Sequence, residues 1–216
     1  MAIKAAIFDL DGTLLDSMHI WSNLCNEFLH AHGIAENIDL DGKLGVLSIR
    51  SALTYILDNY PLDTDLDTAC METWQIVENF YRNEVTLKQG VMRLLNELEA
   101  YRIPAGIITA TETGLVKHAL HRVGLTEYFA EVLSCADLQT SKRKPEVFMM
   151  LADKFGAKPG EIMVFEDALY AAETAKNAGF NVAAVYDPSE RNSAVLKKTA
   201  DYYCRSWEDF PLHLLH

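Results

Sequence analysis

Positive charge is scarce in this sequence. Of its 216 residues, 19 are lysine or arginine and 31 are aspartate or glutamate, so the formal net charge at neutral pH is −12. Nucleic acids and anionic membrane surfaces both attract basic faces of proteins. We therefore expect neither of them to be the main partner, and we interpret the acidity as the property of a well-solvated surface.

The sequence also lacks the cysteine spacing of a metal centre. Its four cysteines, Cys25, Cys70, Cys135 and Cys204, are widely separated, and no CxxC pair occurs. This spacing is typical of free thiols in a reducing compartment. The default interpretation of each cysteine is a residue that packs in the core.

Long hydrophobic runs and targeting patterns are missing as well. No apolar run approaches the length needed to span a bilayer, and Lys4 and Asp9 interrupt the N-terminus before a signal-peptide pattern can form. We find no internal repeat, low-complexity segment or long linker. We therefore expect a cytoplasmic protein. Half of the residues are hydrophobic, which is enough for a sizeable core in one domain, or in one domain with an insertion.

Short apolar runs alternate with helical patterns along most of the chain. The runs are residues 2–10, 103–109, 132–135, 162–165, 182–185 and, less clearly, 201–204. Runs of this kind fit strands that are buried on both faces of a parallel sheet. Between them, apolar residues recur at helical spacing, as in Val91, Leu94, Leu95 and Leu98. The alternation predicts a doubly wound parallel α/β sheet.

One stretch departs from this alternation. From about residue 17 to residue 83 the sequence shows only helical patterns, which end near Gly33, before Pro61 and near Asn83. The stretch follows the first predicted strand and precedes the second. We therefore predict an all-helical domain, residues 16–83, inserted into an α/β core made of residues 1–15 and 84–216.

Polar side chains follow the predicted strands. Asp9, Asp11 and Gly12-Thr13 follow the first strand, Thr109 ends the second, Lys142 and Lys144 follow the third, and Glu166-Asp167 follows the fourth. In open α/β sheets the ligand site lies beyond the carboxyl ends of the strands. These side chains are therefore expected to converge on one crevice.

The composition of this crevice suits a phosphate ester and a hard cation. Clustered carboxylates without cysteine or histidine favour Mg²⁺, which takes a few oxygen ligands together with water and phosphate. With the charges screened, a carboxylate can attack a phosphoryl group and form an aspartyl-phosphate. A lysine and a hydroxyl would stabilise the transferring oxygens, and a second carboxyl group would protonate the leaving group.

The motifs resemble those of the haloacid dehalogenase-like superfamily, in its phosphatase branch with a helical cap after the first strand. "DLDGTLLDS" is similar to the first motif of that family, "IIT" to the second, the lysine loop "SKRKPEVF" to the third and "FED" to the fourth. The resemblance covers nearly the whole chain. It implies a Mg²⁺-dependent phosphatase that acts on a small phosphorylated metabolite.

The resemblance also implies a role for each motif residue. Asp9 would be the nucleophile and a metal ligand, and Asp11 the general acid and base, with its backbone carbonyl on Mg²⁺. Thr109 and a lysine of the third motif would bind the phosphoryl group. Asp167 would be a metal ligand, with Glu166 bound to the metal directly or through water.

Two motifs depart from the family pattern. Ala168 and Ala171 stand where the fourth motif commonly has serine and glycine, and the third motif usually reads Lys-Pro-x-Pro. Aligned backwards from Glu146, this third motif makes Lys142 the catalytic lysine. Lys144 is then expected to lie near the helix cap and to face solvent, with Pro145 in the first turn of the helix.

Other functions stay open at this stage. The alternative is a β-phosphoglucomutase-like enzyme, although Trp21 falls roughly where such mutases have a cap histidine. Dehalogenases and phosphonatases lack the second aspartate of the first motif, so Asp11 argues against both. A phospho-signalling receiver module also gathers Asp, Thr, Lys and Mg²⁺, but its phosphorylated aspartate follows the third strand. Sustained turnover would exclude the receiver.

The sequence does not name the substrate. In this architecture specificity resides in cap residues that reach the cleft, and we predict Arg50 as a substrate contact, with Lys43 and Ser48 as further candidates. The cap is expected to hinge near residues 14–17 and 82–88. We expect a monomer or a weak homodimer.

Overall fold

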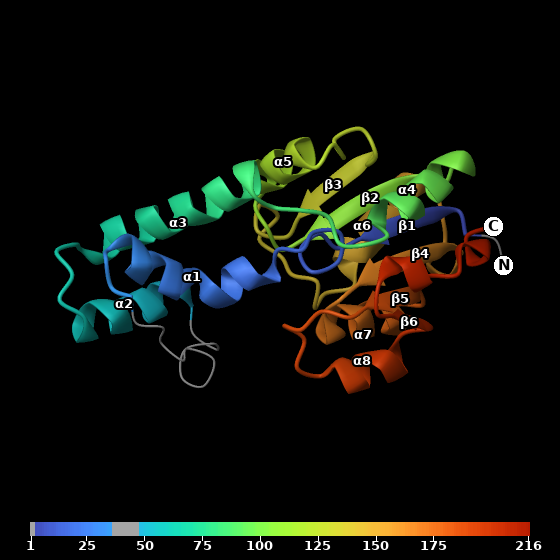
Figure 1. The fold of residues 1–216 in the computed structure, drawn as a ribbon. Helices are drawn as coiled ribbons and strands as arrows, with labels where there is room; N and C mark the ends of the chain where they lie inside the picture. The colour runs from blue at the N-terminus through green and yellow to red at the C-terminus, as the bar shows by residue number, and fades with distance from the viewer. Residues whose placement is uncertain (1–2, 36–47) are drawn as a thin grey trace. The chain divides into compact units, whose positions relative to one another are not determined.

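The computed structural model describes residues 3–35 and 48–216, and its chain divides into two compact units (Figure 1). One unit comprises Met1–Ser17 and Val85–His216, and the other Met18–Glu84. We call them the core unit and the helical unit. Lys43, one of the predicted substrate contacts, lies outside the described residues.

The core unit contains a six-stranded sheet in the order β3-β2-β1-β4-β5-β6, and every paired neighbour is parallel. The strands are β1 (Ala5–Phe8), β2 (Ala105–Thr109), β3 (Glu131–Ser134), β4 (Ile162–Glu166), β5 (Asn181–Val185) and β6 (Tyr202–Cys204). The predicted doubly wound parallel sheet is confirmed. The first strand is shorter than the predicted residues 2–10, because the chain leaves the sheet before the acidic residues.

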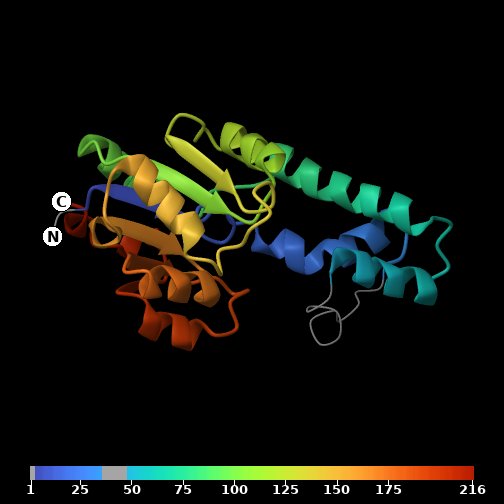
Figure 2. The ribbon, with the colours of Figure 1, turned by 180° about the vertical axis from the view of Figure 1, so that it is seen from behind.

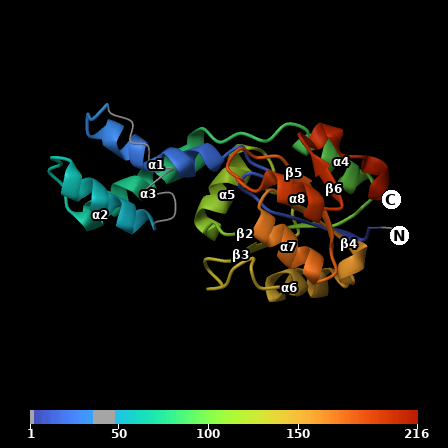
Figure 3. The same ribbon diagram turned by 90° about the horizontal axis from the view of Figure 1, so that it is seen from below.

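Helices cover both faces of the sheet, and the order of the crossover connections determines which helix lies on which face. They are α4 (Val91–Ala100), α5 (Thr113–Arg122), α6 (Glu146–Phe155), α7 (Leu169–Asn177) and α8 (Ser193–Thr199). The chain moves outward from β1 to β3 and then returns to β4 on the other side, so right-handed crossovers place α4 and α5 on one face and α6 to α8 on the other. Figure 1 shows α4 in front of the sheet, and Figure 2, seen from behind, shows α6 in front of it. Figure 3, seen from below, shows α4 and α6 on opposite sides of the strands.

Alternate residues of the central strands supply two core layers. Ile7 on β1 packs in one cluster with residues of α6 and α7, such as Phe148 and Ala172. Phe8, the next residue, faces the other way and stacks on Phe165 with ring centroids 4.4 Å apart. β1 is therefore buried on both faces, which is why its sequence is apolar without alternation.

The helical unit consists, among its described residues, of α1 (Met18–Ala31), α2 (Ile49–Asn59) and α3 (Leu66–Asn83). Its core is formed by Phe28, Leu29, Leu53, Ile56 and Ala69, which lie on the helix faces that the 3.6-residue period predicts. Side-chain oxygens of Ser48 and Asp65 accept hydrogen bonds from the first turns of α2 and α3. Over residues 3–35 and 48–216, no helix has the length and apolar character needed to cross a membrane.

Helix ends follow the sequence with one correction. Gly124, two residues after the end of α5, and Gly156, directly after α6, adopt positive φ angles of 74° and 61°, as expected for glycines that terminate helices. Pro145 does not lie in the first turn of α6 as predicted. It occupies the N-cap position with a helical φ of −63°, and the helix begins at Glu146. A proline has no backbone N–H to donate, and it fits at this end for that reason.

Gly90, at the start of α4, packs against the C-terminal segment of the chain. Its φ is +87°, and a Cβ there would stand 2.3 Å from the backbone nitrogen of Glu208. We expect Gly90→Ala to lower the free energy of unfolding by about 3 kcal/mol, because strain and a backbone clash add. Gly124→Ala is the matched control, since it also has positive φ but no atom within 4 Å, and it should lower the same quantity by about 1 kcal/mol. Urea unfolding of both variants measures the difference, and equal losses would contradict the clash.

Candidate active site

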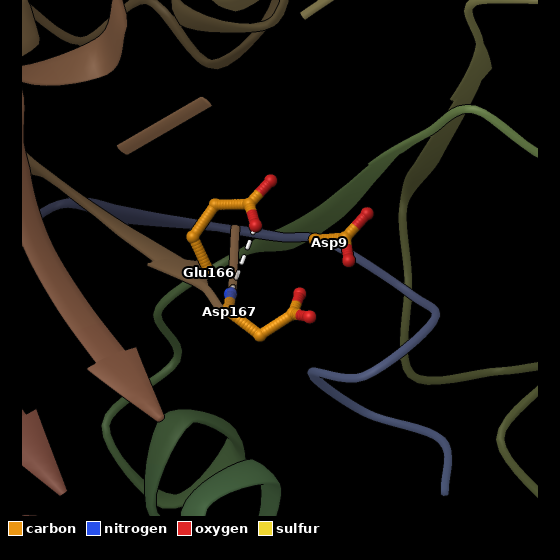
Figure 4. Close-up of side chains that lie close together, drawn as sticks. All are labelled: Asp9, Glu166 and Asp167. Carbon is orange, nitrogen blue, oxygen red and sulfur yellow. Dashed lines mark hydrogen bonds between the residues drawn. The ribbon is translucent and has the colours of Figure 1, made fainter. Parts of the chain in front are cut away.

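Three buried carboxylates meet at the carboxyl edge of the sheet. Asp9 follows β1, Glu166 ends β4 and Asp167 follows it, and one carboxylate oxygen of each lies within 4.8 Å of the others. Figure 4 shows the three side chains together, with the hydrogen bond from the Asp167 backbone N–H to Glu166 Oε2 (2.8 Å). Because β1 and β4 are neighbours in register, with Phe8 opposite Phe165, residues that follow them emerge side by side.

Lys142 is the cation of this cluster. Its ammonium group donates to Asp9 Oδ1 at 2.5 Å and to Glu166 Oε1, and only 4% of its side chain is exposed. The lysine belongs to the loop between β3 and α6. The same loop carries Arg143, whose guanidinium lies 4.4 Å from the ring centroid of Tyr170 on α7. The loop is thereby connected to the helix that follows the acidic pair.

Burial sets the protonation of these groups. It raises the pKa of Asp9 to about 6, against the lowering effect of Lys142, and it raises the pKa of Asp167 well above its usual value, helped by the Glu166 and Asp9 charges. Burial would lower the pKa of Lys142, but the Asp9 and Glu166 carboxylates outweigh it and raise that pKa well above its usual value. The site is therefore short of positive charge.

Asp11 lies in the loop that follows β1, two residues after Asp9, and has different hydrogen-bond partners. Its Oδ1 accepts from Ser17 Oγ and its Oδ2 from Thr111 Oγ1, both at 2.6 Å. It is partly exposed, whereas Asp9 is buried. The two aspartates of the first motif thus differ in environment, one paired with a buried ammonium and the other held by two hydroxyls.

Two buried threonines complete the cluster. Thr13 donates to Asp167 Oδ1 at 2.9 Å, which ties the first motif to the fourth. Thr109 ends β2, the neighbour of β1, and its Oγ1 accepts from the backbone N–H of Thr111 at 3.0 Å. Since β2, β1 and β4 are adjacent, Thr109, Asp9 and Glu166 come from the ends of three neighbouring central strands.

Sequence reasoning missed Ser17, Thr111 and the contact made by Thr13. Thr13 stands inside the first motif. Thr111 lies two residues beyond Thr109, on the alternation that would keep it on the same side of an extended chain. The positions of Thr13 and Thr111 in the sequence could therefore have indicated that both belong to the site. Ser17 is the last residue of the stretch identified as the first motif, but its contact with Asp11 was not predicted.

Two other predicted positions lie elsewhere. Lys144 is exposed, next to Pro145 at the start of α6. Arg50, predicted to contact substrate, belongs to the helical unit, where its Nη2 lies 2.8 Å from Asp67 Oδ1 in an exposed ion pair. Whether Arg50 or Ser48 contacts a substrate stays a prediction.

A family model described as haloacid dehalogenase-like hydrolase matches residues 6–185. The match covers both the first and the fourth motif, and it takes in more than half of the chain. The chain therefore belongs to the haloacid dehalogenase-like hydrolases, and the family predicted from its motifs is confirmed.

Individual relatives agree with this family. A probable pseudouridine-5'-phosphatase of Drosophila melanogaster is 27% identical over 212 residues, which cover 93% of this chain and 91% of the relative. A fructose-1-phosphate phosphatase of Escherichia coli is 25% identical over 181 residues, which cover 83% of this chain and 94% of the relative. The predicted enzyme class, a phosphatase of this family, is confirmed.

Solved structures share the fold. A putative β-phosphoglucomutase from Thermotoga maritima superposes with a TM-score of 0.84 at 21% identity, over 99% of this chain and 97% of that one. At this identity the likeness establishes the architecture alone, so it does not distinguish a mutase from a phosphatase.

Proposed function

We propose that this protein is a Mg²⁺-dependent phosphomonoesterase that acts on a small phosphorylated metabolite through an aspartyl-phosphate intermediate. The observation that carries the proposal is the pairing of buried Asp9 with buried Lys142 beside Glu166 and Asp167. A carboxylate held next to an ammonium group can receive a phosphoryl group whose negative charge the ammonium then shares.

In the first step, Asp9 attacks phosphorus and the bond from phosphorus to the ester oxygen breaks. The electron pair leaves with that oxygen, which takes its proton from the carboxyl group of Asp11. Lys142 and the Thr109 hydroxyl stabilise the phosphoryl oxygens during the transfer. The products are an alcohol and the Asp9 acyl phosphate.

In the second step, Asp11, now a carboxylate, takes a proton from water. The resulting hydroxide attacks phosphorus and breaks its bond to the Asp9 oxygen, so inorganic phosphate leaves and both aspartates return to their starting forms. The hydroxyls of Ser17 and Thr111 hold Asp11 between these two proton transfers.

The donor set fits a divalent cation. One carboxylate oxygen from each of three residues lies within 4.8 Å of the others. Lys142 pairs with two of these carboxylates, those of Asp9 and Glu166. When all three carboxyl groups are ionised, the cluster with Lys142 therefore keeps two uncompensated negative charges. Oxygen donors of this kind suit Mg²⁺. Asp9, Asp167 and Glu166 would hold the ion, with the backbone carbonyl of Asp11. When bound, it would screen the charge between nucleophile and phosphate.

This fit has a test that does not depend on activity. A carboxyl group whose pKa is raised on folding stabilises the protein below its ordinary pKa and loses that contribution as the pH rises through the folded value. For Asp9 the window runs from 3.8 to about 6, and Asp167 shifts in the same direction. We expect Asp167→Asn to raise the Tm in EDTA, increasingly so as the pH rises above about 4, because it removes one of the repelling charges.

The same variant reports on the ion. Excess MgCl₂ should raise the Tm of the wild-type protein at pH 7, because a ligand of the folded state stabilises it, and Asp167→Asn should lose most of that increase. Asp16→Asn is the control, since Asp16 is an exposed carboxylate of the same loop. A wild-type Tm that does not respond to MgCl₂ would contradict the metal site.

For the substrate we propose a phosphate monoester of a sugar or of a nucleoside. The names of two relatives give pseudouridine 5'-phosphate and fructose 1-phosphate as their substrates. A screen of phosphorylated metabolites with Mg²⁺, read as released inorganic phosphate, tests the proposal. Absence of turnover on every ester would refute it, and a long-lived phosphoprotein without turnover would favour a receiver module.

The mutase alternative has its own discriminating experiment. Trp21, roughly where such mutases carry a cap histidine, donates its indole N–H to the Tyr81 hydroxyl at 3.1 Å within the helical unit. An indole cannot exchange a proton with a sugar hydroxyl as an imidazole does. We expect β-glucose 1-phosphate with glucose 1,6-bisphosphate to yield free phosphate. Rapid formation of glucose 6-phosphate without free phosphate would overturn the phosphatase proposal.

We further propose that the helical unit is a cap that closes over the core unit and carries substrate contacts such as Arg50. The two connections between the units fall at residues 17–18, at the end of the predicted hinge 14–17, and at residues 84–85, within the predicted hinge 82–88. Closure of this kind excludes water while the phosphoenzyme forms. The cytoplasmic location and the monomer or weak homodimer stay predictions from the sequence.

A further inference from the structure

A half-buried lysine outside the catalytic cluster, Lys88, contacts the loop that carries Asp9 and Asp11, and 14% of its side chain is exposed. Lys88 Nζ donates to the carbonyl oxygen of Gly12 at 2.7 Å and to that of Tyr186 at 3.0 Å, and it pairs with Asp187 Oδ2 at 2.8 Å. All three ammonium hydrogens therefore have an acceptor. No motif of the sequence marks this lysine.

Asp187, the partner of Lys88, is buried, and both of its carboxylate oxygens accept hydrogen bonds. It follows β5, only 2% of it is exposed, and its Oδ1 accepts from the backbone N–H and the hydroxyl of Ser189. Burial alone would raise its pKa, but the bonds from Lys88 and Ser189 lower the pKa below its ordinary value. The Asp187 carboxylate is held by these bonds away from solvent, and the half-buried Lys88 ammonium has its three acceptors in the protein.

The contacted carbonyl lies between two residues of the site. Gly12 stands between Asp11, which Ser17 and Thr111 hold, and Thr13, which donates to Asp167. Gly12 has a φ of +83°, and its N–H donates to the Leu15 carbonyl at 2.9 Å, so the loop closes tightly on itself. A rotation of the peptide after Gly12 would therefore displace both neighbours.

A second donor, which is buried, holds the next carbonyl oxygen of the first motif. The indole N–H of Trp207 donates to the Thr13 oxygen at 2.7 Å, and Trp207 is fully buried. Two successive carbonyls of the first motif are thus fixed by donors 76 and 194 residues away in the chain. Neither donor contacts the carboxylate cluster.

We propose that Lys88 and Asp187 form a positioning pair for the phosphoryl-transfer reaction: they fix the Gly12 carbonyl and so hold Asp11 where it can protonate the leaving group. This inference rests on the proposed function. The pair touches neither substrate nor reacting atoms, and it acts through the backbone of the first motif.

The experiment compares two esters of similar size that differ in their need for a proton. The leaving group of p-nitrophenyl phosphate departs with little protonation, whereas that of phenyl phosphate needs a proton from Asp11. The ratio kcat/KM reports the step in which the leaving group departs. A variant that merely lowers the amount of folded enzyme reduces kcat/KM equally for both esters, but a misplaced general acid does not.

We expect Lys88→Met to lower kcat/KM for phenyl phosphate about 100-fold, because a catalytic group displaced by about 1 Å loses a factor of that order. For p-nitrophenyl phosphate the loss should be about fivefold or less. Asp187→Asn keeps the side-chain shape, and, like Lys88→Met, it should lower kcat/KM more for phenyl phosphate than for p-nitrophenyl phosphate. Lys176→Met removes a more exposed ion pair, in which Lys176 Nζ in the last turn of α7 lies 2.7 Å from Asp201 Oδ1, and it should leave both values within about twofold.

The outcomes separate this inference from the function on which it rests. A wild-type protein that hydrolyses neither ester would refute the proposed function itself. If the wild-type protein is active and both variants lose activity equally on the two esters, or lose none, the positioning role is wrong. Should Lys88→Met fail to fold, Asp187→Asn decides. Failure of both variants to fold would make the pair a requirement of the whole core unit and overturn the proposal.

Discussion

Asp9→Asn should reduce kcat at least about 10⁴-fold, because it replaces the nucleophile by an amide of the same shape. The fold should survive, since Asp9 is buried beside Lys142 and an amide oxygen can still accept the hydrogen bond from that ammonium group. Turnover of p-nitrophenyl phosphate with Mg²⁺ measures the loss. Far-UV circular dichroism and the Tm show that the variant is folded.

A matched control is available in the same loop. Asp16→Asn removes an exposed carboxylate seven residues further on, and it should leave kcat within about twofold, because exposed charges contribute little. Trapping experiments add a second readout, since the wild-type protein should carry acid-stable label from a phosphorylated substrate and Asp9→Asn should not. If Asp9→Asn keeps more than background turnover, the nucleophile has been assigned to the wrong residue.

Lys142→Met should lower kcat/KM about 10³-fold, as expected when a preorganised donor to the transferring oxygens is lost. The structure adds a consequence for stability. Without the ammonium group, Asp9, Glu166 and Asp167 face one another without a lysine or arginine partner, so the variant should have a lower Tm at pH 7 than at pH 5. Excess Mg²⁺ should restore part of that Tm, which separates loss of charge from loss of packing.

Lys144→Met is the control for this prediction. Both lysines lie in the same loop two residues apart, but Lys144 is exposed and Lys142 is 4% exposed. Lys144→Met should therefore leave kcat/KM and Tm nearly unchanged. If Lys144→Met is the crippled enzyme, the alignment of the third motif from Glu146 backwards is wrong.

Most of the secondary structure of the core unit can be predicted from local sequence patterns. The six strands and the helices α4 to α7 follow from local patterns, because a strand buried on both faces is apolar throughout and a helix repeats its buried face every 3.6 residues. The short helix α8 (Ser193–Thr199) was not predicted. The boundaries differ by a few residues, as at β1 and at Pro145, where the start of α6 depends on backbone hydrogen bonds that a propensity does not specify.

The sequence also located the acidic cluster, because one topological rule places strand ends together. Asp9, Thr109 and Glu166 are distant in the chain, but parallel strands that share a sheet end at the same edge. Ser17 and Thr111 were missed as partners of Asp11. Their contacts depend on how the loop after β1 turns, and glycine and hydroxyl residues are compatible with many such turns.

The distant residues that contact the backbone of the first motif could not be predicted from the sequence, because their contacts depend on the folded core unit. Lys88 and Asp187 are 99 residues apart, and Trp207 reaches Thr13 across 194 residues. No periodicity or residue spacing in the sequence predicts these contacts. They arise from the strand order β3-β2-β1-β4-β5-β6 and from the packing of the C-terminal segment against Gly90. Local patterns encode which residues are buried, whereas the pairing of buried polar groups is fixed only when the whole core unit has closed around them.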